Sequence, residues 1–211
     1  DVYKRQPGGV FSTDASLGRT ARFLGGLGAV NAGFAIAGQA VNTPQTLTEE
    51  YDGSSFSEGG ALPAAAACMG TAGTVNAGFI AGGNVDGSPN NVEALEYDGS
   101  SWSETTDLPS TSCGNTIGAG ETSEAALFGV TTGFSPTTCR LGHWHTWNGS
   151  AWSEVSDTNT AHYNGFYGGI TNDAHVGMTW GPPNIIDPST EIYNGIAWAV
   201  SCLLYTSPSP R

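Results

Sequence analysis

A six-residue pattern that occurs four times along the chain is the feature that most constrains its fold. Each copy reads aromatic, Asp or Asn, Gly, any residue, a small residue, aromatic. The copies are Tyr51–Phe56, Tyr97–Trp102, Trp147–Trp152 and Tyr193–Trp198. Their closing aromatic residues are 46, 50 and 46 residues apart, so the chain is organised as about four units of similar length.

The chemistry of this pattern predicts a tight β-hairpin. Asp-Gly and Asn-Gly tolerate the positive φ angles that short hairpin turns require, and aromatic residues favour half-buried pleated surfaces. We therefore expect Gly53, Gly99, Gly149 and Gly195 to lie in hairpin turns. The flanking aromatic side chains are expected to pack against the neighbouring sheet.

The stretch before each hairpin also recurs. Val30–Phe34 is repeated as Val75–Phe79, and apolar runs at 124–129 and 174–181 take the same place in the last two units. Gly, Pro, Asn and Ser separate these segments, and no sustained helical period is present. Four short strands in a unit of this length predict an all-β fold, a β-propeller of about four four-stranded antiparallel blades in an incomplete ring. The expected blades are residues 7–57, 58–103, 104–153 and 154–201.

The order of segments resembles kelch repeats, in which an apolar strand ending in glycine is followed by a loop, a strand ending in Tyr, and then a Trp. The full Gly-Gly doublet is present only at Gly82-Gly83, and the Tyr-to-Trp gap is short, so the set is a divergent one of the galactose oxidase/kelch type. A rival resemblance is the Asp-box of sialidase-type propellers, but an aromatic residue, such as Tyr97, stands where its Asp would be. The hairpin is also similar to repeats in open reading frames of marine viruses and bacteria.

The two ends of the chain do not read like the rest. Residues 1–6 and 202–211 can be back-translated into the two ends of a transposase-type sequencing adapter, whose codons are related by an inverted repeat. We therefore expect both ends to be adapter-derived and residues 7–201 to be a fragment of a longer protein.

The balance of charge excludes some classes of partner. The whole chain has a formal charge of −13, and residues 7–201 contain three arginines against eighteen acidic residues, which gives −15. Binding to nucleic acid needs Lys and Arg to displace counterions, so we expect no nucleic-acid partner. No apolar run approaches the roughly 20 residues of a membrane helix, so no membrane insertion is expected either.

The cysteines predict no disulfide framework. Once Cys202 is excluded, the remaining Cys68, Cys113 and Cys139 have no CxxC spacing. Cys68 and Cys113 fall at similar points in successive units, and we interpret them as small buried strand residues.

His143 and His145 form the sharpest candidate for a metal pair. Residues two apart in a strand share one face, and His162 or His175 could supply a third ligand. The pair precedes a hairpin in the outer half of its unit, however, and we favour two surface or packing histidines. Some kelch-like propellers are copper oxidases that use Tyr, His and a modified Cys, but no such set can be placed in this sequence.

Other polar groups also have simpler explanations than chemistry. Glu49 and Glu50 would point to opposite faces of a strand, which favours a solvated edge over acid–base work. The loop 86–91 is rich in oxygen ligands for Ca²⁺, but such turns are common. Asn148 begins a glycosylation sequon that its Asn-Gly turn already explains. No Gly-x-Ser-x-Gly elbow is present. We therefore assign no catalytic residue, no metal ligand and no cofactor.

These observations favour a non-catalytic binding or structural module. Its blade-end loops would present a surface to a protein or carbohydrate ligand, as part of a viral or cell-surface adhesion protein on a virion or in an extracellular location. The alternative is a fragment of a propeller enzyme, of oxidase or glycosidase type, whose active-site residues lie in missing blades.

Overall fold

The computed structural model describes residues 15–85, 91–110, 116–132, 140–160, 166–181 and 185–201. Every regular element in these ranges is a β-strand. The described ranges therefore contain no apolar helix of the length that crossing a membrane requires. The predicted adapter-derived ends, 1–6 and 202–211, lie outside the described residues.

Four antiparallel sheets of four strands each follow one another along the chain. Sheet 1 contains β1 (Gly25–Ala29), β2 (Ala32–Ile36), β5 (Thr48–Tyr51) and β6 (Phe56–Glu58). Sheet 2 contains β8 (Gly70–Thr74), β9 (Ala77–Ala81), β11 (Ala94–Tyr97) and β12 (Trp102–Glu104). Sheet 3 contains β13 (Thr116–Thr122), β14 (Ala125–Thr132), β15 (Arg140–Trp147) and β16 (Trp152–Val155). Sheet 4 contains β17 (Phe166–Ile170), β18 (Asp173–Gly181), β19 (Ile185–Tyr193) and β20 (Trp198–Val200).

Two short ribbons complete the described strands. In one, β3 (Gln39–Ala40) pairs with β4 (Thr43–Pro44), and in the other β7 (Ala66–Ala67) pairs with β10 (Asn84–Val85). The second ribbon joins the segment that enters sheet 2 to the segment that follows its second strand. The ribbons therefore lie at the end of the strands opposite to the hairpin turns.

The four predicted hairpin turns are confirmed. Gly53, Gly99, Gly149 and Gly195 have φ angles between 87° and 96° and lie between the paired third and fourth strands of their sheets. In each turn the preceding Asp or Asn accepts hydrogen bonds from the backbone N–H groups two and three residues ahead, as Asp98 Oδ1 does from Ser100 and Ser101 (2.9 Å each). The repeated dipeptide therefore fixes the turn through local chemistry alone.

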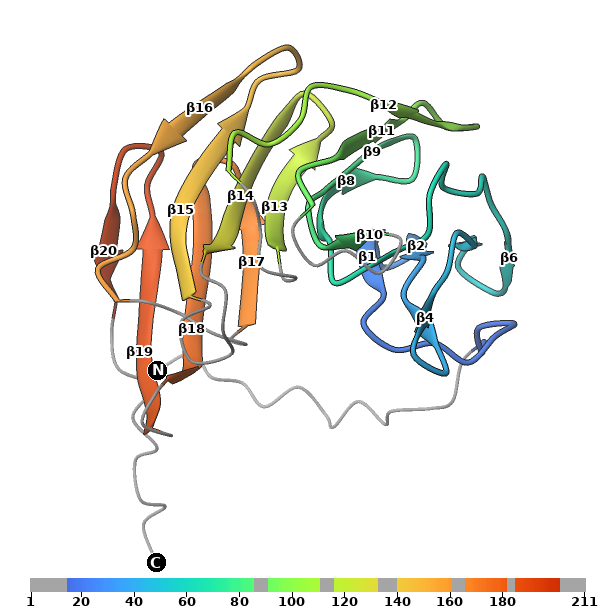
Figure 1. Cartoon of the computed structure of the whole chain (residues 1–211), viewed down its shortest axis with the longest axis horizontal. Helices are drawn as coiled ribbons and strands as arrows, with labels where there is room; N and C mark the ends of the chain where they lie inside the picture. The colour runs from blue at the N-terminus through green and yellow to red at the C-terminus, as the bar shows by residue number, and fades with distance from the viewer. Residues whose placement is uncertain are drawn as a thin grey trace, which may run out of the picture.

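Successive sheets contact each other through their first strands. β1 lies against β8, β8 against β13, and β13 against β17. In Figure 1 the sheets follow one another around an arc, with these first strands on its inner side and the fourth strands towards its outside. No backbone pairing joins sheet 4 to sheet 1 among the described residues.

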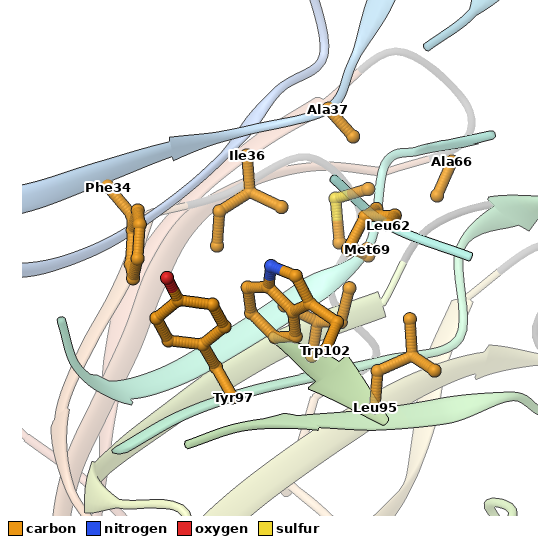
Figure 2. Packing of buried hydrophobic residues seen from close by; sticks show 10 residues of the cluster. Phe34, Ile36, Ala37, Leu62, Ala66, Met69, Leu95, Tyr97 and Trp102 are labelled. Atoms are coloured by element: carbon orange, nitrogen blue, oxygen red, sulfur yellow. The ribbon is translucent and has the colours of Figure 1, made fainter. Parts of the chain in front are cut away.

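Each gap between neighbouring sheets is filled by the aromatic residues of a hairpin. Between sheets 1 and 2, Tyr97 and Trp102 point towards Phe34 and Ile36 of β2 (Figure 2), and the Tyr97 and Phe34 rings meet edge to face with centroids 4.9 Å apart. The prediction that these aromatic residues pack against the neighbouring sheet is confirmed.

The other two gaps repeat this packing. Between sheets 2 and 3, Trp147 stacks on Phe79 at 5.5 Å. Between sheets 3 and 4, the ring centroids of Trp198 and Trp144 are 4.4 Å apart. Burial of such large side chains contributes about 2–3 kcal/mol each, so the hairpins are the main apolar contacts that hold the sheets together.

Candidate functional site

A cavity of about 310 Å³ lies where the first strands of the four sheets converge. Its lining comes from β1, β8, β13 and β17, together with Leu24 and Met69 just before two of these strands. More than half of the lining residues are glycine, and none is charged. The volume is at the lower end of the range for small-molecule sites, about 300–1,000 Å³.

Glycine is required in this lining for two reasons. Gly73 has a φ angle of 95° at the end of β8, and a Cβ atom there would lie 2.1 Å from the Ala77 carbonyl oxygen. Gly118 faces a neighbouring sheet, and its Cβ atom would lie 2.7 Å from the Thr71 carbonyl oxygen of β8. The glycines therefore allow tight turns and close approach between first strands, and they leave backbone groups uncovered at the cavity.

The backbone of the lining strands is available for hydrogen bonding. Each first strand is the edge of its sheet and pairs with one neighbour only, so one row of its N–H and C=O groups faces away from that sheet. One of these groups is bridged across the lining, because the Thr71 hydroxyl donates to the Gly26 carbonyl oxygen at 2.6 Å. The lining is thus polar through its backbone and carries no formal charge.

Apolar and aromatic side chains are exposed around the cavity. Tyr167 of β17, which lines it, is 44% exposed, and Phe23 and Leu24 before β1 are also exposed. Partial burial raises the pKa of the Tyr167 phenol, with a smaller contribution from the nearby Cys68. Tyr167 is therefore a neutral ring at physiological pH that is accessible to a ligand.

Cys68 differs from the prediction of a buried strand residue. It lies between β7 and β8 in a left-handed conformation (φ 58°) and is only partly buried. Its N–H donates to the Phe23 carbonyl oxygen, and its own carbonyl oxygen accepts from Thr116 N–H. The residue joins segments of three sheets through its backbone, while burial raises the pKa of its thiol. Cys113 and Cys139 lie outside the described residues.

His143 and His145 of the described strand β15 do not come together with a third metal ligand. His145 is 2% exposed, and burial lowers the pKa of its imidazole, whereas His143 is only partly buried, with its Nδ1 3.6 Å from Glu154 Oε1. His175 lies in sheet 4 beside Asp173 (3.5 Å), and His162 lies outside the described residues. Across the described ranges no three His, Cys, Asp or Glu side chains are close enough to hold a metal ion.

The prediction that Glu49 and Glu50 form a solvated edge is wrong. The two side chains do point to opposite faces, but Glu49 is 6% exposed and pairs with Arg19 Nε at 3.0 Å. Glu50 accepts a hydrogen bond from the Tyr97 hydroxyl of sheet 2 at 2.8 Å. The sequence of one strand could not show this, because both partners are about 30 or more residues away in the chain.

Glu191 is a second buried carboxylate, and the sequence interpretation missed it. It is fully buried, and its oxygens accept hydrogen bonds from the backbone and side chains of Asn159 and Thr160. Burial raises the pKa of Glu191, but these hydrogen bonds outweigh burial and leave the pKa below its usual value. Glu49 and Glu191 both stand two residues before the opening aromatic of a hairpin, which is the signal that could have found them.

The remaining polar candidates have structural explanations or lie outside the described residues. Asn148 Oδ1 accepts from Ser150 and Ala151 N–H groups within its turn, as Asp and Asn do in the other hairpins. Residues 86–90 of the oxygen-rich loop are not described, and Asn91 Oδ1 accepts from Glu93 N–H (3.2 Å).

No protein-family model matches this chain, and a search of curated proteins finds no significant match. The proposal for function is therefore based on the geometry of the cavity.

Proposed function

We propose that this chain is a non-catalytic binding module, an arc of a kelch-like β-propeller that takes a neutral carbohydrate into its central cavity. The observation that carries the proposal is the uncharged, glycine-lined cavity with the exposed Tyr167 ring beside it. Rigid β-sheets that hold a binding site at their convergence are a common arrangement for ligand sites.

The chemistry of the lining favours sugar hydroxyls over charged groups. Backbone N–H groups donate and C=O groups accept, so they match hydroxyls, which do both. A lining without charge offers no compensation for burying an ionic ligand. The face of an aromatic ring such as Tyr167 provides flat apolar area against the C–H face of a sugar ring. On this proposal the module belongs to an adhesion protein at a virion or cell surface.

Binding of neutral glycans to the full chain tests the proposal. Titration calorimetry with neutral mono- and disaccharides should show binding, and Tyr167→Ala should weaken it by about 1–2 kcal/mol, or roughly five- to thirtyfold. Ile170→Ala is the matched control, because Ile170 is similarly exposed (39%) in the same strand but does not line the cavity. Equal affinity of the two variants would contradict the proposal, as would turnover of a sugar or alcohol by the chain.

A further inference from the structure

The segment that enters sheet 1 holds an exposed aromatic residue in a strained backbone conformation. Phe23 has a left-handed φ angle of 56°, and its side chain is 57% exposed. A positive φ angle is uncommon for any residue other than glycine, and for a bulky residue it is an outlier that destabilises the fold. Because the exposed ring gains little from burial in return, packing does not explain why a phenylalanine occupies this position.

The other described non-glycine residues with positive φ angles either have structural explanations or lie beside Phe23. Val41 and Asn42 form the two-residue turn between β3 and β4, a turn type that requires positive φ at both positions. Ala37 is fully buried. The remaining one, Cys68, is bonded directly to Phe23 through its backbone. The strain that packing and turn geometry do not explain is therefore concentrated at this pair.

Backbone hydrogen bonds fix the position of Phe23. Arg22, the residue before it, donates its N–H to the Gln39 carbonyl oxygen at 3.0 Å and accepts from the Gln39 N–H at 2.7 Å. The Phe23 carbonyl oxygen accepts from the Cys68 N–H at 3.0 Å. The Arg22 guanidinium carbon lies 5.3 Å from the centroid of the Phe23 ring. The surrounding structure thus maintains the strained conformation and presents the ring in a defined place.

This place is the end of the cavity at which the first strands begin. Leu24, which follows Phe23, lines the cavity and is 37% exposed, and Met69, which follows Cys68, also lines it. Tyr167, a further lining residue, is close enough to Cys68 for the thiol to contribute to the raised pKa of its phenol. Two exposed aromatic residues, Phe23 and Tyr167, therefore both neighbour Cys68 at this end of the cavity.

The size of the cavity indicates what the Phe23 ring would contact. A volume of about 310 Å³ is at the lower end of the range for small-molecule sites, so a longer ligand has to continue past the lining. A ligand that leaves the cavity beside Leu24 meets Phe23 next. A flat aromatic face suits the apolar C–H face of a sugar ring, while the hydroxyl groups at the edge of the sugar stay in water.

We propose that Phe23 forms a second sugar subsite at this end of the cavity, so that the module takes a neutral oligosaccharide of two or more rings. One sugar ring occupies the cavity beside Tyr167, and the next packs on Phe23. The inference rests on the proposed carbohydrate function, to which it adds the length of the ligand and the end at which it leaves the cavity.

The dependence of affinity on ligand length tests the subsite. Titration calorimetry on the full chain uses glucose, galactose, mannose and N-acetylglucosamine, each beside a linear disaccharide of the same sugar. For the sugar that binds, the disaccharide should bind about tenfold more tightly than the monosaccharide. Phe23→Asn should remove most of this gain and leave the affinity for the monosaccharide within about twofold, whereas Tyr167→Ala should weaken binding of both.

Val41→Asn is the matched control. Val41 is also an exposed apolar residue with a positive φ angle, 95% exposed and 48°, and it does not line the cavity. Because asparagine adopts the left-handed conformation more readily than phenylalanine or valine, both variants should leave the thermal midpoint unchanged or raise it. Only Phe23→Asn should weaken binding of the disaccharide.

The possible failures separate this inference from the proposed function. Equal disaccharide affinity of the parent chain and Phe23→Asn would overturn the subsite and leave carbohydrate binding in the cavity standing, as would equal affinity of the parent chain for monosaccharide and disaccharide. A clear fall in the thermal midpoint of Phe23→Asn would show that the ring serves folding, and it would also overturn the subsite. Absence of binding for all eight sugars would overturn both proposals.

Discussion

Sheets 2 and 4 use the same hairpin but satisfy their polar groups differently. The two Tyr–Trp ring pairs have nearly the same geometry, with ring centroids 5.0 and 5.2 Å apart and an interplanar angle of 41° in both. In sheet 2 the polar contact lies at the aromatic tip, where Tyr97 donates to Glu50 of sheet 1. In sheet 4 the carboxylate is Glu191, which lies two residues before the tyrosine and holds the connector from sheet 3.

Aromatic packing and polar anchoring are therefore separable in the repeat. Glu191 aligns with Leu95 of sheet 2, which is 6% exposed, so the same buried position accepts an apolar residue or a fully hydrogen-bonded carboxylate. Thr146 aligns with Glu50 and donates to the Ser153 carbonyl oxygen of its own sheet instead. A buried carboxylate is tolerated only because its hydrogen bonds compensate for lost hydration.

Glu191→Leu gives sheet 4 the leucine that sheet 2 has at this position, and it should cause the largest loss of stability. The substitution leaves the N–H groups of Asn159 and Thr160 without their acceptor, and we expect a loss of about 2–4 kcal/mol in the free energy of unfolding. Urea unfolding at neutral pH measures the loss. The reciprocal variant Leu95→Glu should also destabilise, because Leu95 lies in a cluster of buried apolar residues where a carboxylate would lose its hydration. An unchanged free energy of unfolding in Glu191→Leu would contradict the anchoring role of Glu191.

The environment of Glu191 also predicts that the stability of the protein depends on pH. The pKa of Glu191 is lowered in the folded protein, so its contribution to stability is present above the usual carboxyl pKa and is lost as pH falls through the lowered value. The difference in thermal midpoint between the parent chain and Glu191→Leu should therefore shrink below about pH 4. A constant difference between pH 7 and pH 3 would contradict this assignment.

Tyr97→Phe and Tyr193→Phe should change the free energy of unfolding by different amounts, and both changes should be smaller than that of Glu191→Leu. Tyr97→Phe removes the hydrogen bond to Glu50 and should cost about 1 kcal/mol, whereas Tyr193→Phe should be nearly neutral. Desolvation and the Glu50 carboxylate raise the pKa of Tyr97 to about 12. Stability from the neutral phenol is therefore present below about pH 10 and lost as pH rises towards 12. Chemical denaturation of both variants, and ultraviolet titration of the tyrosines, check these expectations.

Asp98→Asn gives sheet 2 the turn residue of sheet 4, and it should change stability at neutral pH the least. Asn194 Oδ1 accepts from the N–H groups two and three residues ahead at 3.0 Å, as Asp98 does, so the thermal midpoint at pH 7 should not change measurably. The backbone N–H of Ser101 and then the Ser100 side chain lower the pKa of Asp98. The parent turn should thus weaken as pH falls below about 4, while the Asn variant should not. Parallel acid profiles of the two proteins would contradict this expectation.

The strands and hairpins were predictable because their chemistry is local. Gly99 and its neighbours specify a turn within six residues, and the closing Trp102 marks the start of the next strand. The candidate site was not predictable, since its lining consists of glycine-rich segments that carry no distinctive side chain until four sheets bring them together. The roles of Glu49 and Glu191 also depend on partners about 30 residues away.

Each sheet is formed from one uninterrupted stretch of the chain, and this has a consequence for synthesis. A sheet can close its hairpins as soon as its last strand has left the ribosome, since no strand has to wait for a distant partner. Its second-strand apolar residue, such as Phe34, then stays uncovered until the next hairpin arrives 46–50 residues later. At about 5–20 residues per second, that interval is a few seconds for each sheet. The repeat length thus sets how long a nascent apolar surface is open to aggregation or to chaperones.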